Sequence, residues 1–171
     1  MWQRACENDA AAEFALGQLF ASDHQCLEND PQYAVRFFVS ADEHGHAGAA
    51  FRLAQIYLNC DNMPLAVQYA KKAADLGESR AQVFVSYVFE CSGNAPEALW
   101  YLMLAADQHV AVAEQHLAEC YQFGMLGLQQ SLPRALKYFK LAQRHGSGSG
   151  AAAAAAAQIQ ILTRQGVVAE P

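Results

Sequence analysis

The chain has 171 residues, of which 53% are hydrophobic and 16% are charged. This length is enough for one domain with its own core, and the apolar balance indicates packed helices rather than a disordered chain. The formal net charge of −6 argues against nucleic acid as a partner, because nucleic-acid binding requires clustered Lys and Arg.

The five cysteines are dispersed along the chain and form no CxxC pair. We therefore expect free thiols in a reducing compartment, and hence a cytoplasmic protein. No stretch has the apolar length of a signal peptide or of a membrane span, which predicts no membrane insertion. If the chain is a fragment, a targeting segment could be missing from this sequence.

The first predicted helix covers residues 10–21 and sets the pattern that the rest of the chain repeats. Ala12, Leu16 and Phe20 fall at i, i+4 and i+8, so they share one helix face. The preceding residues 1–9 are interpreted as the end of a partial repeat or as an N-terminal cap. Gly17, next to the core leucine, is expected to let another backbone come close.

A second helix is predicted after the polar stretch 22–30. Asp30 and Pro31 favour its start, because an aspartate side chain accepts a hydrogen bond from an unpaired N–H and proline has none. The helix is expected to end at Gly45, since a glycine adopts positive φ without strain. The two helices form the first predicted repeat, residues 10–45.

The same helix-turn-helix unit returns over residues 46–77, 78–109 and 110–146. Equivalent positions are 37, 32 and 32 residues apart, which is the range of helical repeat arrays. A proline opens each second helix, and a potential capping residue stands two positions earlier. These capping residues are Asn62, Asn94 and Ser131.

Six apolar positions keep their phase in all four repeats. The first helices carry Ala12, Ala49, Ala81 and Ala113, then Leu16, Leu53, Val85 and Leu117, then Phe20, Tyr57, Phe89 and Tyr121. The second helices carry Ala34, Ala66, Ala98 and Ala135, then Phe37, Tyr69, Tyr101 and Tyr138, then Ala41, Ala73, Ala105 and Ala142. We expect the small residues to bring paired helices together and the aromatics to fill the space between neighbouring pairs.

Residues 147–171 depart from this pattern. A Gly/Ser link is followed by seven alanines, Ala151 to Ala157, and by a short tail. Because alanine has the highest helix propensity, residues 151–165 are predicted to form a C-terminal capping helix with little to bury.

The repeated pattern resembles the Sel1-like repeat, a relative of the tetratricopeptide repeat. It reads A-x3-L-G/A-x2-Y/F, a loop, and A-x2-Y-x3-A-A/D-x2-G, and Tyr121, Gly124 and Gly127 are nearest to the YxxGxG loop of that family. The resemblance covers residues 10–146. It implies an all-α fold, an α/α superhelix of about four helix-turn-helix repeats with a C-terminal capping helix, used as an adaptor that holds proteins together. It carries over no catalytic residue.

The histidines are the first candidates for chemistry. His44, His109 and His145 lie at or next to helix C-termini, where an imidazole is expected to interact with the last carbonyls. His116 and Cys120 are four residues apart on one helix, a spacing that suits two metal ligands. Two further ligands would have to come from other repeats, so packing is the favoured interpretation of this pair.

The remaining thiol and loop candidates are weaker. Asp23, His24 and Cys26 share the first loop. Three further cysteines lie near the ends of first helices and are interpreted as buried packing residues. These are Cys60, Cys91 and Cys120. No phosphate loop, GxSxG or HExxH motif is present. We therefore predict no enzyme, no cofactor and no metal site, with a small Cys/His-dependent hydrolase or metal-binding protein as the alternative.

The first helices are expected to line the concave face of the array. The position before the core leucine or valine varies, being Ala15, Arg52, Phe84 and His116 in successive repeats. Variation between constant core positions is typical of a peptide-reading groove, with Arg52 for an acidic group and Phe84 for an apolar anchor. The predicted partner-binding residues are Gln18, Arg52, Gln55, Phe84, His116 and Glu119. The competing interpretation is that they are ordinary half-buried positions between repeats.

The sequence thus predicts a non-enzymatic protein–protein interaction module, an adaptor or scaffold that binds a protein or peptide segment in this groove. A further alternative is a structural protein that self-associates by end-to-end stacking of the array.

Overall fold

The computed structural model describes residues 9–22, 31–146 and 148–170, and all regular structure in these residues is α-helical. In chain order the helices are α2 (Ala10–Ser22), α3 (Pro31–Glu43), α4 (Ala47–Asn59), α5 (Met63–Asp75), α6 (Ser79–Cys91), α7 (Ala95–Asp107), α8 (Ala111–Phe123), α9 (Leu132–His145) and α10 (Gly150–Arg164). The predicted all-α class is confirmed. The expected cap at Asp30, the segment 1–8 and the loop candidates Asp23, His24 and Cys26 lie outside the described residues.

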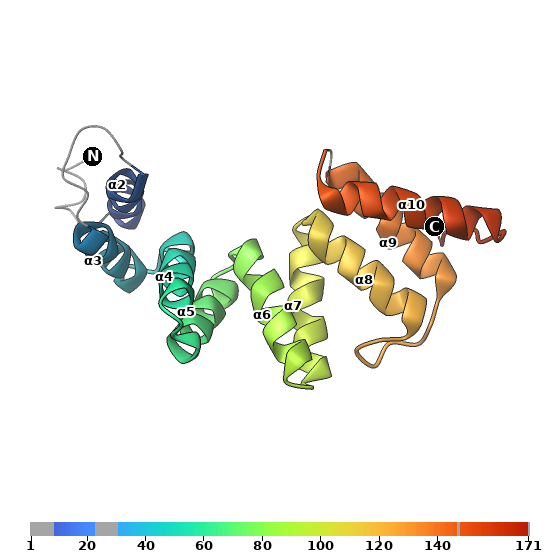
Figure 1. Cartoon of the computed structure of the whole chain (residues 1–171), viewed down its shortest axis with the longest axis horizontal. Helices are drawn as coiled ribbons and strands as arrows, with labels where there is room; N and C mark the ends of the chain where they lie inside the picture. Colours follow the sequence, from blue (N-terminus) through green and yellow to red (C-terminus); the bar gives the residue numbers. More distant parts are fainter. Residues whose placement is uncertain (1–8, 23–30, 147, 171) are drawn as a thin grey trace. The chain divides into compact units, whose positions relative to one another are not determined.

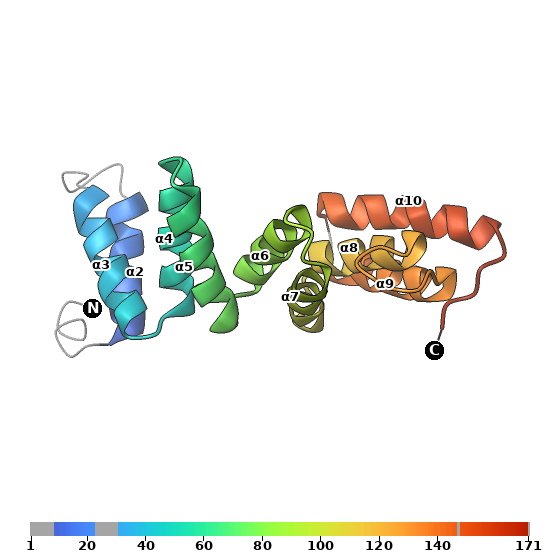
Figure 2. The same cartoon turned by 90° about the horizontal axis from the view of Figure 1, so that it is seen from below.

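The chain divides into two compact units, with the boundary between Ala81 and Gln82. In the first unit α2 packs on α3, α3 on α4 and α4 on α5, as can be followed in Figure 1. In the second unit α7 packs on α8, α8 on α9, and α10 lies along both α8 and α9 (Figure 2). Within each unit the helices therefore pack mainly on their neighbours in the sequence, and α10 also contacts α8.

The recurrent small and branched positions form the core of both units, as predicted. The small residues of the second helices, Ala41, Ala73, Ala105 and Ala142, are 0% exposed. The first-helix positions Leu16, Leu53, Val85 and Leu117 are also buried. An alanine at a helix contact leaves little side chain between the two backbones, so the helices of a pair approach closely.

The recurrent aromatic residues stack in pairs within each repeat. Tyr57 and Tyr69 also pack against a core cluster that includes residues of the first repeat, and Tyr121 and Tyr138 against one that includes residues of the third, as expected of side chains between neighbouring helix pairs. The stacked pairs are Phe20 with Phe37, Tyr57 with Tyr69, Phe89 with Tyr101, and Tyr121 with Tyr138. Their ring centroids lie between 5.3 and 5.8 Å apart. Because the chain reverses direction after each first helix, the end of that helix lies beside the early part of the second, and this brings the two rings together.

The helices begin and end at the predicted capping and terminating residues, with one exception. Gly45 and Gly77 have φ values of +81° and +93°, so both close a helix in the left-handed region. Asn62 accepts a hydrogen bond from the Leu65 N–H, whereas Asn94 makes no side-chain capping bond. The capping prediction is therefore wrong for Asn94, although that residue does occupy the N-cap position.

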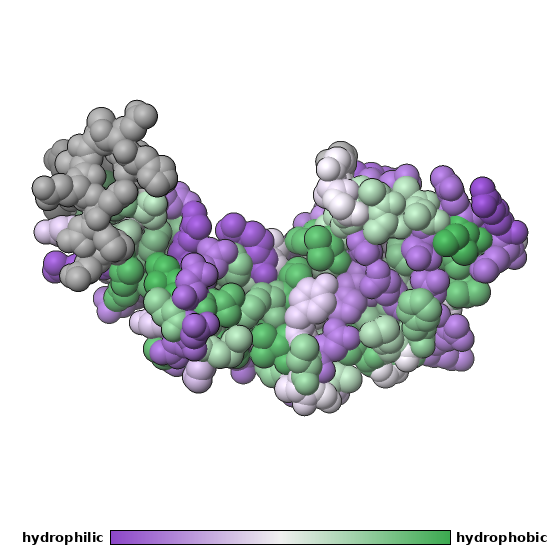
Figure 3. Space-filling view, viewed as in Figure 1, coloured by the Kyte–Doolittle hydropathy of each residue, from purple (hydrophilic) through white to green (hydrophobic). Residues whose placement is uncertain are grey.

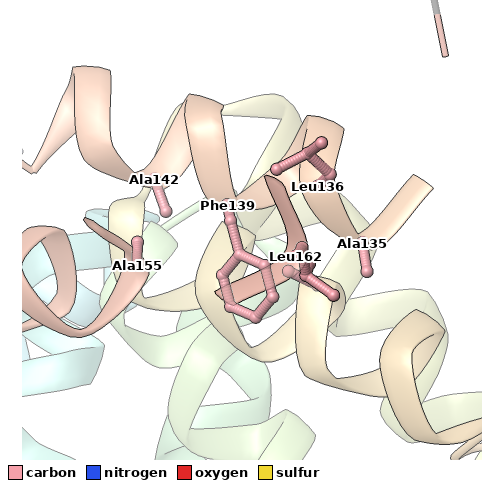
Figure 4. Close-up of a cluster of buried hydrophobic side chains, with 7 residues drawn as sticks. Ala135, Leu136, Phe139, Ala142, Ala155 and Leu162 are labelled. Carbon is pink, nitrogen blue, oxygen red and sulfur yellow. The ribbon is translucent and has the colours of Figure 1, made fainter. Parts of the chain in front are cut away.

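The C-terminal helix α10 buries more than its alanine-rich sequence indicates. Ala155 and Leu162 are fully buried against Phe139 and Leu136 of α9, and Figure 4 shows these side chains side by side. The helix thus covers the last repeat as a cap. Neither α10 nor any other helix in the described residues has the length and apolar character needed to cross a membrane.

Gly17 of α2 faces an aromatic ring rather than a backbone, which corrects the sequence expectation. A Cβ atom at this position would lie 2.6 Å from Cε1 of Phe38. That distance is shorter than carbon atoms tolerate, so the missing side chain is what allows the buried Phe38 ring to lie against α2.

We predict that Gly17→Ala lowers the free energy of unfolding by about 1–3 kcal/mol, the usual cost of overpacking, despite the higher helix propensity of alanine. Urea denaturation followed by circular dichroism measures the change. The double variant Gly17→Ala/Phe38→Leu should lose less unfolding free energy than the two single variants lose together, because the smaller leucine side chain at position 38 relieves the clash with the alanine at position 17. Additive effects would contradict this account of the contact.

Candidate functional site

A pocket of about 420 Å³ opens in the first unit among α2, α3 and α4. Two of the predicted binding residues, Arg52 and Gln55, line it, and Gln18 of α2 does not. The complete lining is Ala21, Phe38, Arg52, Gln55, Ile56, Leu58 and Asn59. The lining therefore combines four apolar side chains with a guanidinium and two amides.

The guanidinium at this pocket has no acidic partner within the described part of the chain. Arg52 Nη1 donates a hydrogen bond to Gln55 Oε1 over 3.3 Å, and this acceptor is neutral. Both side chains are half-buried. Gln55 thus holds the Arg52 guanidinium in place, and no carboxylate of the described residues neutralises its positive charge, which suits the pocket for an anionic group.

The predicted binding residues of the second unit have neighbours of their own. His116 is only 7% exposed, its Nε2 lies 3.2 Å from Glu90 Oε2, and its ring stacks on Tyr87. Glu119 accepts a hydrogen bond from the Gln115 amide over 2.9 Å. His116 therefore links α8 to α6. The side chain that a partner could contact at this position is the exposed Tyr87. Phe84, on α6, is half-buried.

Cys120 is fully buried beside this group. Burial, together with smaller contributions from the carboxylates of Glu90 and Glu119, raises the pKa of its thiol to about 12. The thiolate needed by a nucleophile or a metal ligand is strongly disfavoured, which argues against a site built on His116 and Cys120.

Two of the other cysteines differ from the sequence interpretation. Cys60 and Cys91 are exposed free thiols, so the expectation that they are buried packing residues is wrong for both and holds for Cys120 alone. The reason is their position at the very end of α4 and α6, where the chain turns away from the core, whereas Cys120 lies within α8.

We predict that iodoacetamide modifies Cys60 and Cys91 in the native protein and leaves Cys120 intact. At pH 8 about one Cys120 thiol in ten thousand is ionised, and burial also denies the reagent access. Peptide mass mapping measures the modification at each site, with urea-unfolded protein as the control in which Cys120 reacts. Equal rates at Cys60 and Cys120 in the native chain would show that the second unit opens here.

Sequence reasoning missed a buried carboxylate–imidazole pair in the first repeat. Glu13 is 4% exposed, its Oε2 lies 2.8 Å from His44 Nδ1, and its Oε1 accepts a hydrogen bond from Ser40 Oγ over 2.7 Å. Both carboxylate oxygens are thus satisfied. The pair joins the first turn of α2 to the residue after α3. The sequence predicted that the His44 imidazole interacts with the last carbonyls of the helix, but in the structure it contacts this carboxylate.

The equivalent positions in the other repeats hold different side chains. In the fourth repeat Glu114 Oε1 lies 2.7 Å from His145 Nδ1. In the third, the Gln108 amide donates to Gln82 Oε1 over 2.9 Å. The second repeat has the apolar residues Ala50 and Leu76 there. The sequence signal was a Glu directly after a core alanine with a His 31 residues later, in both the first and the fourth repeat.

We predict that Glu13→Ala destabilises the first unit by about 2 kcal/mol, because His44 and Ser40 lose their common partner. The double variant Glu13→Ala/His44→Leu should recover most of this loss, since a buried ion pair can be replaced by apolar residues at little cost. The second repeat already uses such an apolar pair. Urea denaturation measures both effects, and a double variant less stable than Glu13→Ala would contradict the prediction.

These observations define an α/α repeat protein whose core positions are constant and whose polar positions vary. No family model matches the chain. A crystal structure of a Sel1 repeat protein from Oxalobacter formigenes is 26% identical and has a TM-score of 0.74, covering 82% of this chain and 60% of that one. The chain therefore has the all-α superhelical fold of a Sel1-like repeat protein, as predicted.

Two curated relatives match parts of the chain. Chitin synthase regulatory factor 4 of Schizosaccharomyces pombe is 27% identical over 112 residues, which are 62% of this chain and 18% of that protein. The DAP3-binding cell death enhancer 1 of Mus musculus is 37% identical over 84 residues, or 48% of this chain and 16% of that protein. The chain thus spans less than a fifth of either relative. The Sel1-repeat fold is generally a non-enzymatic protein–protein interaction module.

Proposed function

We propose that the chain is a non-enzymatic adaptor that binds an acidic segment of a partner protein through the Arg52 pocket of its first unit. The observation that carries this proposal is a guanidinium at the pocket without a carboxylate partner in the described residues. The mouse relative is named for binding DAP3, and the yeast relative is named as a regulatory factor of chitin synthase. Both names describe proteins that act on other proteins.

The pocket lining specifies the chemistry of the ligand. An Asp, Glu or terminal carboxylate can pair with Arg52, and the Gln55 and Asn59 amides can hydrogen-bond the adjoining peptide groups. Ile56 and Leu58 offer apolar contact to a neighbouring aliphatic or aromatic side chain. We therefore propose a short motif in which an acidic residue stands next to an apolar one.

Affinity in this account comes from a few anchors rather than from one large apolar surface. Polar and apolar residues intermix over the face that Figure 3 shows. In the first unit Leu58 is exposed at the pocket, and in the second unit Tyr87 and the half-buried Phe84 provide a separate apolar contact. Interfaces of this kind depend on a small number of aromatic and arginine contacts.

The alternatives predicted from the sequence are less well supported. A Cys/His-dependent hydrolase would need an ionisable thiol, and burial raises the pKa of Cys120 to about 12. End-to-end stacking would need an apolar end, and α10 covers part of the apolar surface of α8 and α9. A protein-binding adaptor in the cytoplasm is accordingly the function that we propose.

We predict that a random-peptide library panned against the purified chain is enriched in sequences with an Asp or Glu beside an apolar residue. Arg52→Glu should weaken binding of the enriched peptides by roughly tenfold or more, because a charged hydrogen bond becomes a repulsion. The matched control is Arg36→Glu, the same charge change at an exposed position of α3 that does not line the pocket. Fluorescence anisotropy measures the affinities.

Equal loss of affinity in Arg52→Glu and Arg36→Glu would mean that net charge, not the pocket, attracts the peptide. Enrichment without acidic residues, or unchanged affinity in Arg52→Glu, would also contradict the proposal. Circular dichroism of both variants keeps unfolding from being mistaken for loss of binding.

A further inference from the structure

Three side chains with metal-binding atoms converge in the second unit, outside the pocket described above. They are His109 after α7, Glu114 in the first turns of α8 and His145 at the end of α9. Their ligand atoms all lie within 4.8 Å of one another, and the two imidazole centroids are 4.4 Å apart. In the described part of the chain no other group of three or more His, Cys, Asp or Glu residues comes together in this way.

The carboxylate in this group has one oxygen without a partner. Glu114 is 1% exposed, and its Oε1 lies 2.7 Å from His145 Nδ1 and 3.8 Å from His109 Nδ1. Its Oε2 is buried and makes no hydrogen bond to the described residues. A buried carboxylate oxygen left in this way costs free energy, and a bound cation would satisfy it.

The first repeat shows what a closed version of this arrangement looks like. There Ser40 donates to the second oxygen of Glu13. The fourth repeat has Leu141 at the position of Ser40, and leucine offers no donor. Glu114 Oε2 therefore has no partner among the described residues, and a further histidine, His109, approaches Oε1 of the same carboxylate.

We propose that His109, Glu114 and His145 bind one divalent transition-metal ion of the Zn²⁺ type. Imidazole nitrogen and carboxylate oxygen are ligands that Zn²⁺ accepts, at about 2.0–2.2 Å. Ligands of a tetrahedral ion at such distances are about 3.4 Å apart, which lies within the range that these three side chains span. Small rotations of the exposed His109 and of His145 bring the atoms to that spacing.

Metal binding moves the proton of the neutral His145 ring from one nitrogen to the other. The hydrogen bond between His145 Nδ1 and Glu114 Oε1 is broken, Nδ1 releases its proton to solvent and Nε2 takes one up. His145 Nδ1 and the Glu114 carboxylate, whose Oε2 has no partner among the described residues, then coordinate the metal. Three protein ligands leave the fourth tetrahedral position open to a water molecule or to a side chain of a partner protein. Because the His109 side chain is 70% exposed, that position is accessible from outside.

The test is isothermal titration of the full chain, free of any affinity tag, with ZnCl₂ alone. Exposed thiols are first blocked with iodoacetamide so that Cys60 and Cys91 cannot supply ligands. We expect saturable binding of one equivalent, weakened by at least about tenfold in His109→Ala and in Glu114→Gln. The matched control is His44→Ala, which removes the histidine of the closed pair and should leave Zn²⁺ affinity unchanged.

Two further readouts locate the ion. Co²⁺ substitution should give visible absorption bands of a four-coordinate site without a thiolate charge-transfer band, and histidine ¹⁵N NMR should show Zn²⁺ shifting His109 and His145. Absence of saturable binding, or unchanged affinity in the still-folded His109→Ala, would overturn the proposal. Equal loss in His44→Ala would overturn it as well, because the ion would then sit elsewhere.

Discussion

The structure depends on alanine at the helix contacts. Ala41, Ala73, Ala105 and Ala142 have no exposed surface, and a larger side chain at any of them would force its helix away from the partner. Close approach of the two helices is what allows the aromatic residues of each repeat to stack beside the contact. The same spacing brings the first turn of one helix within hydrogen-bonding distance of the end of the next. Backbone packing thus fixes where polar side chains can meet.

One such meeting point occurs in all four repeats with three different chemistries, and the first and fourth repeats share the carboxylate–imidazole pair. The carboxylate and imidazole of Glu13 and His44 are replaced by the amides of Gln82 and Gln108 in the third repeat, and by apolar residues in the second. The backbone frame accepts all of these because the position lies at the edge of the core. Polar side chains can therefore differ from repeat to repeat without a change of fold. One chain can thus contain both a pocket lined by Arg52 and a histidine cluster around Glu114.

The sequence predicted the core well and the contacts poorly. Periodicity places Tyr57 and Tyr69 on the inward faces of their helices. Knowing the face of a residue does not reveal which side chain it contacts, so the stacking of these two rings within one repeat was missed. Glu114 was overlooked because a charged residue beside a core position is usually solvent-exposed, and only its burial against His145 shows otherwise. The sequence placed His116 among the partner-binding residues, because its contacts Glu90 and Tyr87 lie on another helix and cannot be read from spacing. Arg52 and Gln55 line one pocket because their i, i+3 spacing on α4 places them together.

The most direct test of the proposed function is an NMR titration of the ¹⁵N-labelled chain with an acidic, apolar peptide selected from the library. The account predicts that the backbone amide signals of Arg52, Gln55 and Ile56 and the guanidinium signal of Arg52 shift saturably. The amide signals of exposed residues of α5 should not shift. Saturable shifts confined to α5 or to the second unit would contradict the account, because the partner would then bind away from the Arg52 guanidinium on which the proposal rests.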